Sequence, residues 1–182
     1  MKPQRTLNKT ITIPEKTTAT LVDTTISIEG PKGKLEREFY YPSVSIKVAD
    51  NTVAVSGPGL KKAKRMMNTF TAHITNMIKG VNDGFHYQLK ICAGHFPVNV
   101  TKEQSTIMIK NFLGEKIPRQ AQIVEGVEVE IKEDLIDVTG ISKEAVGQTA
   151  ANLEQATKIR NRDRRRFQDG IFIIEKDKEA EQ

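Results

Sequence analysis

Nine residues near the carboxyl end of the chain, from Lys158 to Arg166, include six basic side chains and a single acid. Like charges held this close together repel one another and destabilise a folded chain unless a polyanion neutralises them. Arginine suits phosphate groups because its planar fork bonds two oxygens at once and its face can stack on a base. The basic residues are Lys158, Arg160, Arg162, Arg164, Arg165 and Arg166. The pattern favours a nucleic-acid backbone as partner over the alternative of a solvated loop without one.

The sequence on both sides of this basic run is acidic. Residues 96–157 carry four more acids than bases and residues 167–182 carry three more, although the whole chain has a net charge of +5. An island of this kind indicates one oriented contact with phosphates rather than a generally cationic surface. A second basic cluster comprises Lys61, Lys62, Lys64 and Arg65. It begins a predicted helix, where the dipole disfavours cations, so a secondary contact with RNA or protein and an ordinary solvated helix face remain equal alternatives.

The residue types that catalysis or metal binding would need are not clustered. The lone cysteine, Cys92, lies in an alternating apolar run, which indicates a reduced and packed thiol. His73, His86 and His95 fall on a predicted helix, strand and turn without the spacing of metal ligands. We therefore predict no enzyme activity, no cofactor, no metal and no small-molecule substrate. No apolar run is long enough to span a bilayer, so we also expect no membrane and a place in the cytoplasm or nucleus.

Hairpins followed by a helix are predicted in the first half of the chain. Residues 24–39 alternate about a turn at Gly30–Gly33, and residues 44–57 alternate about a polar turn at 49–52. Apolar residues at helical spacing from Ala63 to Ile78 then predict a helix that stops at Gly80. Each feature contributes one part of a small α+β unit.

The same order of elements returns after Ile107, which indicates an internal duplication. At an offset of 83 residues, Ile46, Val48, Val53 and Val55 match Val129, Ile131, Ile136 and Val138. The predicted fold class is therefore α+β, with two tandem homologous units that each pack a small antiparallel sheet against one main helix. We expect residues 1–82 to form the first unit and residues 83–174 the second, with Ser142 capping its helix and a strand through Ile171–Ile174. Residues 175–182 are expected to form a charged flexible tail.

Four segments carry a resemblance to a known family. They are GPKGKLEREF, HITNMIKGVNDGFHYQLKICAGHFPVNV, NFLGEK and QTAANLEQATKIRNRDRRRFQDGIFIIEK. Together they closely resemble the universal sixth protein of the large ribosomal subunit, in its archaeal and eukaryotic form. The resemblance extends from about Thr10 to Lys176 and so covers nearly the whole chain.

This resemblance implies a structural constituent of the large, 60S-type subunit that takes part in translation. It implies binding of large-subunit rRNA mainly through the second unit, near the sarcin-ricin loop and the stalk base, with neighbouring large-subunit proteins there as further partners. By position, Gln148, Asn152, Lys116 and the basic run would face the RNA. The implied location is the cytoplasmic ribosome, with nuclear or nucleolar assembly if the source is eukaryotic. The alternative is a free RNA-binding regulatory protein that is not permanently assembled in ribosomes.

Overall fold

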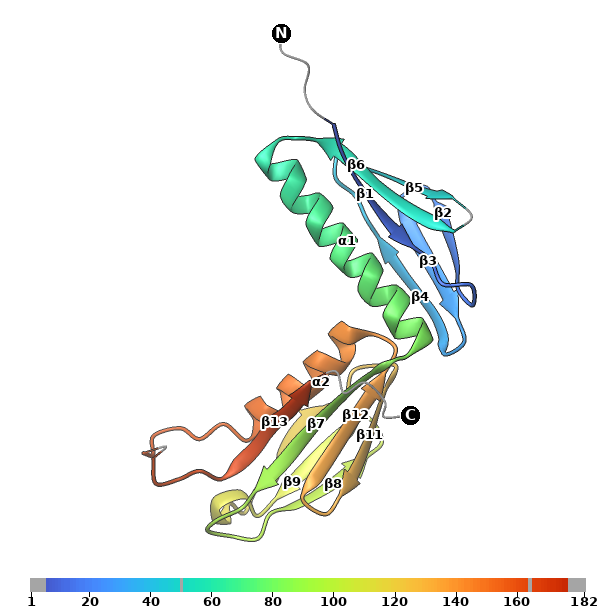
Figure 1. Cartoon of the computed structure of the whole chain (residues 1–182). Coiled ribbons are helices and arrows are strands. Elements are labelled where there is room, and N and C mark those ends of the chain that lie inside the picture. The colour runs from blue at the N-terminus through green and yellow to red at the C-terminus, as the bar shows by residue number, and fades with distance from the viewer. Residues whose placement is uncertain (1–5, 50, 164, 177–182) are drawn as a thin grey trace. The chain divides into compact units, whose positions relative to one another are not determined.

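The computed structural model describes residues 6–49, 51–163 and 165–176. The chain forms two compact units, residues 1–83 and residues 84–182, each described here by itself. Figure 1 shows the elements of both units. The prediction of an α+β fold built from small antiparallel sheets and helices is confirmed.

The described residues of the first unit form two three-stranded antiparallel sheets and one long helix. Their strand orders are β1-β6-β5 and β2-β3-β4. The elements are β1 Thr6–Thr12, β2 Thr18–Val22, β3 Thr25–Gly30, β4 Gly33–Glu38, β5 Ser45–Ala49, β6 Thr52–Pro58 and α1 Lys61–Asn82. The helix buries Met67, Phe70 and Ile74 against a core that includes Ile28 and Val55. The predicted hairpins are thus β3–β4 and β5–β6.

The second unit repeats this plan and adds one strand. Its sheets have the orders β11-β12-β7-β13 and β10-β9-β8. The elements are β7 Phe85–Cys92, β8 Asn99–Glu103, β9 Thr106–Lys110, the 3-10 turn η1 Phe112–Gly114, β10 Arg119–Gln122, β11 Val127–Lys132, β12 Leu135–Gly140, α2 Lys143–Ala156 and β13 Gly170–Lys176. Helix α2 buries Val146, Ala150 and Leu153 among Leu89 and Ile136. The order β1-β6-β5 recurs as β7-β12-β11, and β13 has no counterpart among the described strands of the first unit.

Equivalent glycines let each helix lie close to its sheet. A side chain at Gly57 would meet the Ser43 carbonyl oxygen at 3.0 Å and the Met67 sulfur at 3.1 Å. A side chain at Gly140 would meet Val146 Cγ2 at 2.9 Å. The two glycines are 83 residues apart, which is the offset of the repeat. The duplication predicted from apolar spacing therefore extends to the contact between helix and strand.

The predicted helix stop at Gly80 is wrong. Helix α1 continues through this buried glycine to Asn82, and Asp83 forms the C-cap. Val81 is fully buried, its carbonyl accepts a hydrogen bond from the Lys32 amide at 2.9 Å, and Asn82 bonds Thr17. These tertiary contacts outweigh the roughly 1 kcal/mol that a glycine costs inside a helix. The backbone takes a positive φ only beyond the helix C-cap, at Gly84, where φ is +74°.

Two strand pairings are not marked by the alternating patterns. Gly57 and Pro58 belong to β6 and pair with Leu7 and Thr6 of β1. Strand β8, which follows β7 in the chain, pairs with β9. Residues 177–182 of the predicted tail lie outside the described residues. Within the described part of the chain, no helix is long and apolar enough to cross a membrane.

Candidate nucleic-acid interface

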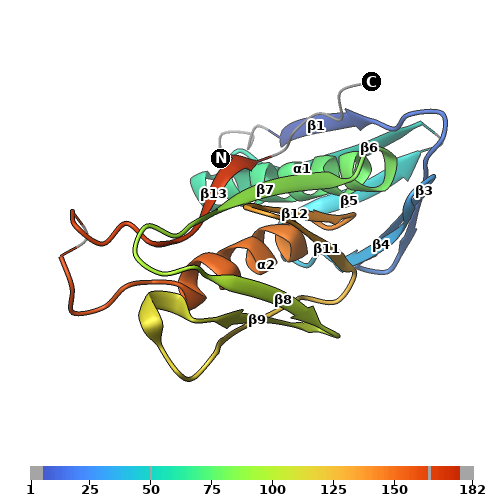
Figure 2. The same cartoon turned by 90° about the horizontal axis from the view of Figure 1, so that it is seen from below.

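The basic run lies in the loop that joins α2 to β13, which we call the arginine loop and define as residues 157–169. Figures 1 and 2 show this loop at the same end of the second unit as η1 and the β7–β8 connection. Ser142 caps the start of α2 through a hydrogen bond from the Ala145 amide, as predicted. At the other end of α2 the buried Thr157 hydroxyl accepts a hydrogen bond from the Ile171 amide at 2.9 Å. This bond joins the two ends of the loop.

Arg119 of β10 holds the start of the arginine loop. Its Nη1 donates to the carbonyl oxygens of Ala156 and Lys158, at 2.9 and 3.2 Å. Its Nε and Nη2 donate to the two carboxylate oxygens of Glu115, at 2.8 and 2.6 Å. The guanidinium carbon also lies 4.4 Å from the ring centre of Phe112. A cation that bonds the last carbonyls of a helix satisfies otherwise unpaired acceptors and complements the helix dipole.

Asp169 holds the far end of the arginine loop. Its Oδ1 accepts hydrogen bonds from the amides of Gly94 and His95 at 2.7 and 3.0 Å, and its Oδ2 lies 2.6 Å from His95 Nδ1. Burial of this carboxyl would raise its pKa, but the bonds from His95 and Gly94 outweigh burial and hold the pKa of Asp169 below its usual value. The loop is therefore tied to the β7–β8 connection by a buried carboxylate.

A depressed pKa makes this tie pH-dependent. The Asp169 carboxylate contributes stability that is fully present above its unfolded pKa of about 3.9 and is lost as the pH falls through the lower folded-state pKa. We expect urea midpoints measured from about pH 6 to about pH 2 to fall less steeply for Asp169→Asn than for the unaltered chain. Other carboxylates titrate equally in both proteins, so the difference isolates Asp169. Parallel pH profiles would show that this carboxylate does not support the fold.

The middle of the arginine loop rests on a stack of flat groups. The His95 and Phe167 rings stack at 4.9 Å with an angle of 26°, and the Arg162 guanidinium carbon lies 4.9 Å from the Phe167 ring centre.

The hydrogen bond from Arg119 lowers the pKa of Glu115, partial burial opposes it, and the charges of Arg119 and Arg162 lower it further. Because Arg119 bonds both Glu115 of the β9–β10 turn and the Lys158 carbonyl of the loop, it links the turn to the arginine loop.

The tip of the loop is a tight turn at Asp163. The Asp163 carbonyl accepts hydrogen bonds from the amides of Arg166 and Phe167 at 3.1 and 3.0 Å. Its carboxylate accepts from Arg165 Nε and Nη2, and the Arg165 side chain is 90% exposed. An exposed ion pair of this kind contributes little to stability. Arg165 can therefore exchange Asp163 for a phosphate at small cost.

Comparisons with known proteins agree with this architecture. The family model described as "Ribosomal protein L6" matches residues 13–84 and 96–170. The chain belongs to the ribosomal protein L6 family. The paired matches correspond to the duplicated units, and membership in a family of ribosomal proteins confirms the prediction that the chain is not an enzyme.

Archaeal relatives of the L6 family align with nearly the whole chain. The protein of Methanobrevibacter smithii is 46% identical over 172 residues, which cover 94% of this chain and 97% of the relative. That of Methanosarcina mazei is 46% identical over 169 residues, or 92% and 96% of the two chains. That of Methanospirillum hungatei is 42% identical over 170 residues, or 93% and 97%. Each bears the name large ribosomal subunit protein uL6, so the resemblance seen in the sequence is confirmed.

The sequence-predicted contact residues of this L6 chain lie in several places. In the arginine loop, Lys158, Arg160, Arg162, Arg165 and Arg166 are exposed, whereas Arg164 lies outside the described residues. On α2 the exposed Gln148 amide donates to Asn152 at 2.8 Å, and the Asn152 amide donates to the Gln122 carbonyl at 3.0 Å. Lys116 is exposed in the β9–β10 turn. The second cluster belongs to the first unit, where Lys61, Lys62, Lys64 and Arg65 are exposed on the first turns of α1.

Sequence reasoning missed the residues that hold the arginine loop. Arg119 and Asp169 bond partners that are 37 and 75 residues away along the chain. Neither belongs to a charge run or an alternating pattern, so no local signal marks them. Within residues 6–49, 51–163 and 165–176, no group of three His, Cys, Asp or Glu side chains could hold a metal ion.

Proposed function

We propose that this chain is a structural constituent of the large ribosomal subunit and binds large-subunit rRNA mainly through its second unit. The observation that carries the proposal is the contrast within the arginine loop. Its two ends are held by hydrogen bonds of the buried residues Thr157 and Asp169, while its described cationic side chains are exposed. A loop fixed before binding loses less conformational entropy when it meets a partner. The L6 family and its relatives named as large-subunit proteins support the choice of rRNA.

The proposed site on the subunit is near the sarcin-ricin loop and the stalk base. The resemblance in sequence supports this placement, with Gln148, Asn152 and Lys116 contributing beside the arginine loop. Large-subunit proteins at the stalk base would be neighbours. The chain would act in translation on cytoplasmic ribosomes, with nuclear or nucleolar assembly applying to a eukaryotic source. The first unit, with Lys61 to Arg65 on α1, would space the docked unit or contact a neighbouring protein or RNA.

The salt dependence of rRNA binding tests this proposal. If five or six phosphates are neutralised, the logarithm of the affinity falls against the logarithm of the salt concentration with a slope of roughly −4 to −5. Filter binding of transcribed large-subunit rRNA at a series of KCl concentrations measures the slope. A slope near zero would contradict the proposal.

The second candidate, a free RNA-binding regulator, differs in how long the protein stays on the subunit. A structural constituent co-sediments with large subunits after a high-salt wash, because many contacts must break together. An occasional binder washes off. Retention on purified large subunits in a sucrose gradient distinguishes these candidates.

A further inference from the structure

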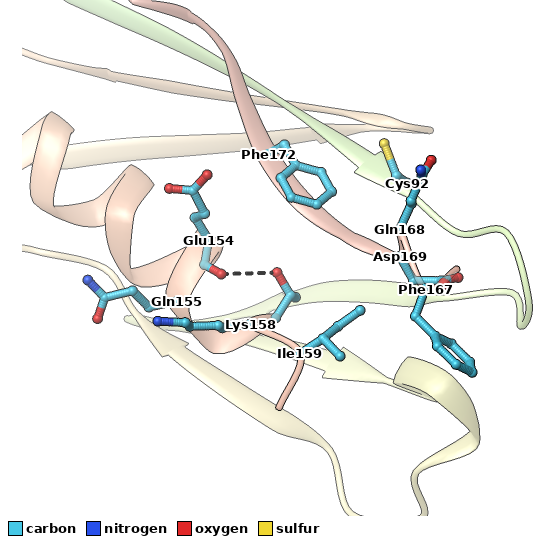
Figure 3. A pocket seen from close by; sticks show the side chains of 10 residues that line it. Cys92, Glu154, Gln155, Lys158, Ile159, Phe167, Gln168, Asp169 and Phe172 are labelled. Carbon is cyan, nitrogen blue, oxygen red and sulfur yellow. Dashed lines mark hydrogen bonds between the residues drawn. The ribbon is translucent and has the colours of Figure 1, made fainter. Parts of the chain in front are cut away.

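A hollow of about 680 Å³ lies beneath the arginine loop. Glu154, Gln155 and Lys158 line it at the end of α2, with Phe167 on the loop and Phe172 on β13 (Figure 3). The hollow is partly open to solvent. Its volume is within the range of about 300–1,000 Å³ that holds small organic ligands.

The lining combines flat apolar surfaces with polar edges. Ile159, Phe167 and Phe172 supply apolar walls, and Gln155 and Glu154 supply an amide and a carboxylate. The Phe172 ring lies against the backbone of β13, because a side chain at Gly170 would meet its Cζ at 3.0 Å. An aromatic ring supported from behind is a good surface for stacking another planar group.

Other polar groups in the walls already have partners. The Asp169 carboxylate accepts three hydrogen bonds from Gly94 and His95. The Thr157 hydroxyl accepts one from the Ile171 amide. The Gln168 amide donates to the Arg165 carbonyl at 3.5 Å. Among the described residues, the polar side chains that remain to meet a ligand are those of Glu154, Gln155 and Lys158. Such a set suits a planar molecule with donors and acceptors along one edge.

We propose that this pocket receives one unpaired base of the large-subunit rRNA, stacked on Phe172 and bonded along its edge by Gln155 and Glu154. The inference rests on the proposed function, since the exposed arginines of the loop hold the phosphates of the same strand at the pocket rim. RNA-binding proteins commonly splay single bases onto aromatic side chains and bond their edges. The Glu154 carboxylate accepts only, so a base with an exocyclic amino group is preferred to uracil.

Filter binding of the full chain to transcribed large-subunit rRNA at several KCl concentrations tests the pocket. Loss of the stacking contact with one base should weaken binding by about tenfold. The salt slope should stay the same, because no phosphate contact is lost. We expect this result for Phe172→Leu, and a loss of about fivefold for the exposed Gln155→Ala, whose lost hydrogen bond is worth about 1 kcal/mol. Tyr40→Leu, which removes an exposed aromatic ring from the first unit, should bind as the unaltered chain does.

Chemical probing gives a second readout. A base that is protected from dimethyl sulfate in the wild-type complex should become reactive in the Phe172→Leu complex. If the pocket variants bind as tightly as wild type, the pocket does not receive a base. The proposed function would still stand, because it is supported by the salt slope of the wild-type chain. A slope reduced by about 1 would also overturn it, since that change reports a lost phosphate contact. If the wild-type chain binds with no salt dependence, the proposed function fails and this inference fails with it.

Discussion

Replacing the five arginines of the arginine loop with serine is expected to abolish association with large-subunit rRNA while the fold is retained. The variant changes Arg160, Arg162, Arg164, Arg165 and Arg166. Charge-assisted hydrogen bonds contribute roughly 1.5 kcal/mol or more each, so their joint loss weakens binding by about a thousandfold or more. The salt slope should fall to between 0 and about −1, because each lost phosphate contact removes nearly one unit. Filter binding measures both quantities.

The fold should survive this change because the described arginines of the loop are exposed and the buried contacts at its ends are untouched. Circular dichroism and a thermal melt check that point. The matched control changes Lys61, Lys62, Lys64 and Arg65 to serine, which removes a similar charge from the first unit. Binding lost equally in both variants would indicate a general charge effect and contradict a dedicated loop.

The spacing of apolar residues predicts those strands and helices that bury one side in a core. In β6 the fully buried Val53 and Val55 alternate with partly exposed residues, so the strand is evident in the sequence. Strand β1 was not predicted, because along it only Leu7 and Ile11 are even half-buried. Its place is set by pairing with β6, a contact between residues about 40 to 50 positions apart. Local sequence patterns do not indicate which distant segments pair.

The candidate site was also predicted only in part from the sequence. The arginine loop was predicted because charge repulsion within a short run is a local property of the sequence. The contacts that shape the loop were not predicted, because Arg119, His95 and Asp169 bond partners that are far away along the chain. His95 illustrates this limit, since the sequence excluded it as a metal ligand but did not reveal that it pairs with a buried carboxylate. Its stacking on Phe167 depends on the same assembled geometry.

Arg119→Ala is expected to destabilise the second unit by about 2–4 kcal/mol, since it removes the donor to the carbonyls of Ala156 and Lys158 and a cation from the Phe112 ring. Urea denaturation measures this loss. Binding of rRNA should weaken by about tenfold, because an unfixed loop must be ordered on binding. The salt slope should not change, since the Arg119 guanidinium already bonds Glu115, Ala156 and Lys158 and is expected to contact no phosphate.

Two variants separate this positioning role from simple loss of charge. Arg119→Lys keeps the charge but should recover less than half of the lost stability, because one ammonium cannot serve both carbonyls and bind Glu115 at two points. Lys110→Ala removes a cation of β9 whose pairing with Glu103, at 3.9 Å, is exposed, and should cost less than about 1 kcal/mol. A salt slope that falls by about one unit in Arg119→Ala would make Arg119 a phosphate contact instead. An unchanged slope with weaker binding at every salt concentration means that the arginine acts by holding the loop in place.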